Sequence, residues 1–71
     1  MTTQELIYNY IKEYIEQEGY PPDYREIAWD CSVSIGSVTY NLNKLEDAGY
    51  IKRQPRKWRT LELTDKQLLS S

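Results

Sequence analysis

The sequence predicts a mainly helical domain, with three helices followed by a small two-stranded β-hairpin. Apolar residues recur at helical intervals in three segments before Gly49, and the pattern changes to strand-like alternation after it. The length of 71 residues allows one domain, which buries only roughly 60% of the surface of its unfolded chain. We place this domain at residues 1–63 and a short C-terminal tail at residues 64–71.

The first helix is expected to begin after Thr2 and to end at Gly19. Thr2 and Glu5 have the spacing of a capping box, and glycine ends a helix at little cost in the left-handed conformation. The apolar stripe consists of Ile7, Ile11, Tyr14 and Ile15, and it is widened by Leu6 and Tyr10. Residues 20–22, Tyr-Pro-Pro, then form a rigid extended connector, because proline fixes φ and disfavours helix in the residue before it.

A second, short helix is expected to begin at the capping box that Asp23 and Glu26 form. Its inward face would carry Ile27, Ala28 and Cys31, and it would end between residues 30 and 33. A tight turn at residues 32–34 leads to the third helix, so that the two helices form a helix-turn-helix. We expect the thiol of Cys31 to be packed in the core, where a small apolar side chain belongs.

The third helix is expected to run from its N-cap, Ser34, to Gly49. Its apolar stripe consists of Ile35, Val38, Leu42 and Leu45. The opposite face carries small, hydrogen-bonding or basic residues, namely Gly36, Ser37, Tyr40, Asn43 and Lys44, flanked by Thr39 and Asn41. A helix with a narrow, polar N-terminal half suits insertion into a DNA major groove. An ordinary amphipathic core helix is the alternative interpretation of this segment.

Two strands, at residues 50–54 and 58–63, are expected to form the hairpin, with residues 55–57 as the loop between them. A hairpin of two strands is marginal alone, so it must pack on the helices through Ile51, Leu61 and Leu63. Residues 64–71 carry no clear folding pattern, and Leu68 and Leu69 are candidates for fraying or for a partner interface.

The distribution of charge favours a nucleic-acid partner, although the net charge is −2. Residues 1–30 carry two basic and seven acidic side chains, whereas residues 50–63 carry five basic side chains and only Glu62 as an acid. Because salt screens interactions beyond about 10 Å, the local field steers a phosphate backbone more than the total charge does. One end of the molecule is therefore expected to be basic.

Several classes of function find no support in the composition. The chain has no histidine, one cysteine, no metal-ligand spacing and no phosphate-binding glycine loop, so we expect neither an enzyme nor a cofactor or metal site. No apolar run approaches the ~20 residues that span a membrane, and no small-molecule ligand is evident. A cytoplasmic protein, of the nucleoid-associated type found in bacteria or phages, is the expectation.

Three segments resemble the winged helix-turn-helix DNA-binding domain of the LexA repressor family. They are G-Y-P-P-D-Y-R-E-I-A at 19–28, L-x-x-L-E-D-A-G-Y-I at 42–51 and R-T-L-E-L at 59–63. The resemblance extends from about Leu6 to Leu63 and implies three helices plus a two-stranded wing. The chain departs from the family pattern in a turn that is one residue shorter and in a third helix that begins Ser-Ile-Gly. The operator sequence therefore cannot be transferred, and these 71 residues do not include the family's self-cleaving domain.

The resemblance implies that the first half of the third helix reads the operator, at Ser34, Gly36, Ser37, Thr39 and Tyr40. From the residue chemistry we add Asn41 and Lys44, because asparagine can bond adenine and lysine can reach guanine. In the basic wing, residues 52–59, phosphate contacts are expected from Arg53, Arg56, Lys57 and Arg59, and a solvated hairpin is the alternative. Tyr24 and Arg25, at the start of the second helix, complete the expected DNA contacts.

The sequence therefore predicts a small LexA-like transcriptional regulator, such as a repressor, that binds specific double-stranded DNA. The alternative is a protein–protein interaction module on the same fold, because Trp29 falls outside the apolar stripe of the second helix. Candidate surfaces for self-association are the Leu68–Leu69 pair, the face around Trp29, and Tyr8 with Tyr10. None is a convincing dimer surface, so we expect a monomer that forms homodimers only on DNA or through a region outside this chain.

Overall fold

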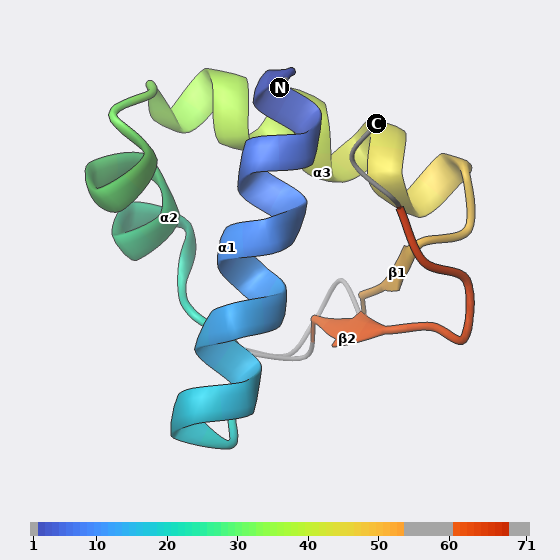
Figure 1. Cartoon of the computed structure of the whole chain (residues 1–71). Helices are drawn as coiled ribbons and strands as arrows, with labels where there is room; N and C mark the ends of the chain where they lie inside the picture. Colours follow the sequence, from blue (N-terminus) through green and yellow to red (C-terminus); the bar gives the residue numbers. More distant parts are fainter. Residues whose placement is uncertain (1, 54–60, 69–71) are drawn as a thin grey trace.

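The computed structural model describes residues 2–53 and 61–68, and it confirms the predicted mainly helical class with a small hairpin. Three helices, α1 (Thr3–Glu18), α2 (Tyr24–Cys31) and α3 (Ile35–Asp47), precede two short strands, β1 (Ile51–Lys52) and β2 (Glu62–Leu63). Figure 1 shows α1 crossing α3, with α2 beside the first end of α3 and the two strands below its C-terminal half, where the chain turns back toward α1. None of the helices in the described part of the chain is long and apolar enough to cross a membrane.

The helix ends are fixed largely as the capping residues predict. The capping box of α2 is complete, because Asp23 accepts from the Glu26 amide at 2.8 Å and the Glu26 carboxylate accepts from the Asp23 amide at 3.4 Å. The box of α1 forms only in part. Thr2 Oγ1 accepts from the Glu5 amide at 3.1 Å, but the Glu5 carboxylate lies 3.1 Å from the Thr2 hydroxyl, which donates to it.

The turn between α2 and α3 is built on a serine in a conformation that favours glycine. Ser32 has φ 56°, and the amide of Val33 donates to the carbonyl of Ala28 at 3.0 Å, which closes the end of α2. A side chain in this left-handed region costs roughly 1–2 kcal/mol. The short turn is therefore maintained by the packing of the two helices that it joins, not by the preference of its own residue.

The end of α3 turns the chain into the first strand. Gly49 adopts φ 88°, its amide donates to the carbonyl of Glu46 at 3.0 Å, and the amide of Tyr50 donates to the carbonyl of Leu45 at 2.9 Å. This is the Schellman arrangement, which uses a left-handed residue to satisfy the last carbonyls of a helix. The predicted role of Gly49 as the helix stop is confirmed.

The two strands pair antiparallel, with Ile51 opposite Leu63 and Lys52 opposite Glu62. They are shorter than the sequence predicts, since β1 ends at Lys52 and β2 begins at Glu62. The loop at 55–57, residue 54 and residues 58–60 of the predicted strands lie outside the described residues. Ile51 and Leu61 are buried and Leu63 packs at the edge of the core, so the hairpin does rest on the helices as predicted.

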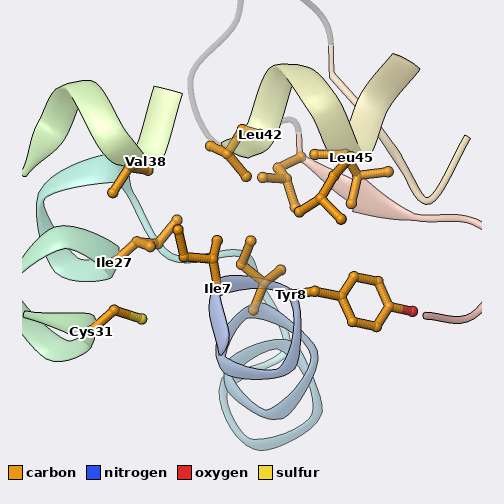
Figure 2. Packing of buried hydrophobic residues seen from close by; sticks show 10 residues of the cluster. Ile7, Tyr8, Ile27, Cys31, Val38, Leu42 and Leu45 are labelled. Atoms are coloured by element: carbon orange, nitrogen blue, oxygen red, sulfur yellow. The ribbon is translucent and has the colours of Figure 1, made fainter. Parts of the chain in front are cut away.

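The core lies where the three helices meet and extends to the hairpin (Figure 2). Its buried residues are Ile7, Tyr8, Ile11, Ile27, Cys31, Val38, Leu42, Leu45, Ile51 and Leu61. The burial of the Cys31 thiol is thus confirmed.

Some side chains lie elsewhere than their predicted positions in or outside the core. Tyr8, predicted as part of a surface for self-association, is only 2% exposed and meets the ring of Tyr50 edge-on, so it cannot form an interface. Leu6 and Ile35, both placed on apolar stripes, are exposed. Ile35 is the first residue of α3, so it lies at the end of the stripe.

Two tyrosines join the long α1 to the short α2. The Tyr10 hydroxyl donates to Asp30, and the Tyr14 hydroxyl donates to Glu26 at 2.7 Å. Burial and the hydrogen bond to Asp30 raise the pKa of Tyr10, whereas the pKa of Tyr14 is raised chiefly by its hydrogen bond to Glu26. Both hydroxyls therefore act as donors that connect α1 to α2. Tyr14, predicted as a core residue, instead lies at the rim of the core with a polar role.

The beginning of the tail packs against the end of α3, although its sequence shows no folding pattern. The Lys66 ammonium donates to the Ala48 carbonyl at 2.8 Å and lies 4.7 Å from the centre of the Tyr50 ring. A cation at a helix C-terminus interacts favourably with the helix dipole. Leu68 is partly buried against the core, so less of its side-chain surface is available to a partner. Leu69 lies outside the described residues.

Candidate nucleic-acid interface

The outward face of α3 carries small and polar groups from its first turn onward. Ser34 caps the helix by accepting from the Ser37 amide at 3.0 Å, so its hydroxyl lies at the exposed N-terminal end. Gly36 and Tyr40 are exposed, with Tyr40 at 59%, and so are Asn43 and Lys44 one turn further on. The first turn holds no acidic residue. This face combines an exposed helix N-terminus with hydrogen-bonding side chains, as groove-reading helices do.

Gly36 has no structural reason to be glycine within the described chain. A Cβ built at this position would meet only Ser34 Oγ, at 3.9 Å, and the residue has ordinary helical geometry. Glycine inside a helix costs about 1 kcal/mol relative to alanine. The missing side chain leaves a flat place on the exposed surface, where another molecule can approach the helix backbone closely.

Tyr40 and Lys44 act as a pair on this face. They are four residues apart, and the Lys44 ammonium lies 4.9 Å from the centre of the Tyr40 ring. The contact holds a positive charge over an exposed aromatic surface near the middle of the helix. A base edge or a phosphate that approached α3 would meet both groups together.

Two residues predicted to contact DNA are engaged with the helix itself. The Thr39 hydroxyl donates to the Ile35 carbonyl at 3.1 Å. Asn41 is only 8% exposed, and its amide nitrogen donates to the Ser37 carbonyl at 2.8 Å. In this conformation the Asn41 amide lies on the inner side of α3, so contact with a base would require a different side-chain position.

Arg53, which follows β1, is held by three residues from two helices. Its guanidinium donates to the Tyr24 hydroxyl at 2.8 Å, to the Asn43 side-chain oxygen, and to the Glu46 carboxylate at 2.8 Å. The ion pair with Glu46 holds the pKa of that carboxyl below its usual range, chiefly through the hydrogen bond. The side chain of Arg53 is only 16% exposed.

The remaining predicted contacts lie at the start of α2 and in the wing. Arg25 is exposed in the first turn of α2, next to Tyr24, whose hydroxyl accepts from Arg53. Arg56, Lys57 and Arg59 lie outside the described residues. Sequence inspection did not assign a role to Glu46 or propose Asn43 as a site residue, because their link to Arg53 appears only when the chain is folded.

Trp29 is exposed to 85%, in agreement with its position outside the apolar stripe of α2. Cys31, two residues on, is a poor nucleophile, because burial and the nearby Asp30 raise the pKa of its thiol. Within residues 2–53 and 61–68, no group of three or more acidic or cysteine side chains is placed to hold a metal ion.

The helices α2 and α3 form a helix-turn-helix in which α3 presents an exposed face, and a hairpin follows α3. This arrangement defines the class of winged helix-turn-helix DNA-binding proteins. Within that class, the sequence pattern described as "LexA DNA binding domain" matches residues 1–60. The chain belongs to this family, which confirms the resemblance seen in the sequence.

Two bacterial relatives are similar to nearly the whole chain. A LexA repressor of Staphylococcus aureus strain N315 is 42% identical over 65 residues, which are 90% of this chain and 31% of the relative. A LexA repressor of Staphylococcus epidermidis is 41% identical over 66 residues, which are 92% of this chain and 32% of the relative. The chain therefore spans about a third of the length of the curated relatives it matches.

Proposed function

We propose that this chain is a sequence-specific duplex DNA-binding domain, which reads the major groove with the outward face of α3. The observation that carries the proposal is the exposed face of α3, on which the bare backbone at Gly36 is followed by the Tyr40–Lys44 pair. Gly36 lets the helix approach the groove, Tyr40 offers an exposed hydroxyl, Ser37 offers a half-buried one that also accepts from Asn41 at 3.4 Å, and Lys44 reaches guanine. Well-placed contacts of this kind contribute about 1–3 kcal/mol of discrimination each.

We propose that residues at the start of α2 and in the wing anchor the domain by contacting backbone phosphates. Arg25 is exposed beside the N-terminus of α2, where it can hold a phosphate. Arg56, Lys57 and Arg59 are the proposed phosphate contacts of the wing. Asn41 and Arg53 are left out of the direct contacts, since their polar atoms are bonded within the protein.

In the cell, we infer that the domain acts as the DNA-reading part of a transcriptional regulator, as the names of its LexA repressor relatives suggest. A single module buries only about 600–1,000 Å² of protein surface on DNA, which is too little for high specificity. Two copies on neighbouring half-sites would supply the rest, so we propose pairing on DNA.

A salt titration tests the proposal. If α3, α2 and the wing together neutralise about four to six phosphates, the logarithm of the binding constant should fall against the logarithm of salt concentration with a slope of roughly −4 to −5. Fluorescence anisotropy with a labelled random-sequence duplex measures this slope. Selection from a random duplex library should then recover a consensus site. Absence of binding even at about 20 mM salt would end the DNA-binding interpretation.

A further inference from the structure

The network around Arg53 joins the three parts of the chain from which DNA contacts are proposed. Arg53 lies directly after β1, Tyr24 is the first residue of α2, and Asn43 and Glu46 lie one turn apart on α3. The partners are 29, 10 and 7 residues from Arg53 along the chain, so the network forms only in the folded domain.

The contacts themselves are short and directional. One guanidinium nitrogen donates to Tyr24, and another donates to both Asn43 and Glu46. Charge-assisted bonds of arginine have a fixed planar geometry, so together they restrict both the position and the orientation of the start of the wing. A lysine at this position would keep the positive charge, but it lacks the planar pair of nitrogens that bonds Tyr24 on one side and Asn43 and Glu46 on the other.

We propose that Arg53 is a positioning residue, which fixes the start of the wing, at Lys52 and Arg53, against α3 and the start of α2 and does not itself contact DNA. This inference rests on the proposed DNA-binding function. A base-reading helix discriminates only when its backbone anchors hold it in one register on the duplex. By fixing where the wing leaves α3, Arg53 makes the phosphate contacts of the wing compatible with one position of α3 in the groove.

Two substitutions separate positioning from direct contact with phosphate. If Arg53 only positions, Arg53→Gln should leave the salt slope of binding unchanged, whereas loss of a phosphate contact would flatten it by about 0.9. The ratio of affinities for the selected site and for random duplex should fall roughly threefold to thirtyfold, as for other groups coupled through one network. Arg53→Lys should lower this ratio nearly as much, although the charge remains.

Glu46→Gln gives opposite expectations for the two roles. Positioning predicts that the affinity ratio falls as it does for Arg53→Gln, and that the double variant is no worse than either single one. If Arg53 instead contacts phosphate, releasing it from Glu46 should leave the ratio unchanged and steepen the salt slope. Lys12→Gln, which removes one positive charge from α1, is the matched control and should change neither quantity.

A DNA-free measurement keeps this inference distinct from the proposed function. Urea unfolding of the four proteins in the Arg53→Gln and Glu46→Gln cycle should show coupling between the two sites in the unliganded domain. If Arg53 and Glu46 are coupled in unfolding but the protein never binds duplex DNA, the proposed DNA-binding function is refuted, whereas the structural link between the two residues stands. The positioning role would be overturned by a different result: the unsubstituted protein binds the selected site, and Arg53→Gln leaves the affinity ratio unchanged but flattens the salt slope by about 0.9.

Discussion

Leu42→Ala is expected to remove a large part of the stability of this domain. Leu42 is fully buried on α3, in the core formed by the three helices (Figure 2). Replacing a buried leucine by alanine costs about 2–5 kcal/mol, because the lost burial is accompanied by a cavity. A domain of 71 residues has a total free energy of unfolding of only about 4–10 kcal/mol. Urea unfolding followed by far-UV circular dichroism measures the loss.

Tyr40→Ala on the same helix is the matched control. The Tyr40 side chain is exposed, so its removal should change the free energy of unfolding by no more than about 0.5 kcal/mol. A loss below about 1 kcal/mol for Leu42→Ala would mean that α3 is not packed through this residue.

The second large effect separates base reading from anchoring. Lys44→Ala should relax the preference for particular base positions by about 1–3 kcal/mol, because Lys44 is exposed on the outward face of α3. Arg56→Ala combined with Lys57→Ala should instead weaken binding to all sequences alike and flatten the salt slope by about two units. Anisotropy titrations on the selected site, on single-base variants and on random duplex measure both effects.

The opposite outcome would reverse the two assignments. If the wing double variant changed the preference among bases and left the salt slope alone, the wing would be the reader. Lys12→Gln serves again as the control, since it removes a cation from a helix outside the proposed interface.

The helices could be predicted from the sequence because their signals are local. The caps at Asp23, Ser34 and Gly49 each depend on residues within a few positions, and the buried stripe of α3 follows the helical period. Such features do not depend on the rest of the fold. The class of the domain followed from these elements and from their order.

The details that were missed depend on contacts between distant segments. Leu6 was predicted as part of the apolar stripe of α1 and Tyr8 as a surface residue, but in the fold Leu6 is exposed and Tyr8 is buried in the core, where its ring meets that of Tyr50. Arg53 was predicted to contact phosphate because it belongs to a basic stretch, and the sequence gives no indication of its link to Glu46. The contact of Lys66 could not be predicted either, because the hairpin must first return the tail to the end of α3, where Lys66 donates to the Ala48 carbonyl.

The exposed face of α3, which is the proposed site, could be predicted from the sequence, but the hydrogen-bond partners of its residues could not. Helical spacing identified the outward side of α3, on which Gly36, Tyr40 and Lys44 are indeed exposed. Spacing placed Asn41 at the flank of that face and Asn43 on it, but it could not show which side-chain amide is bonded within the protein. The structure buries Asn41 against Ser37 and leaves Asn43 beside Arg53.

The outward face of α3 as the DNA-binding surface is tested most directly by a nuclear magnetic resonance titration. Adding a duplex that contains the selected site to ¹⁵N-labelled protein should shift the amide signals of residues 34–44 and of Arg25, and leave the Trp29 indole signal in place. Shifts concentrated around Trp29, with the signals of α3 unchanged, would contradict the proposed surface and point instead to a contact through the exposed face of α2.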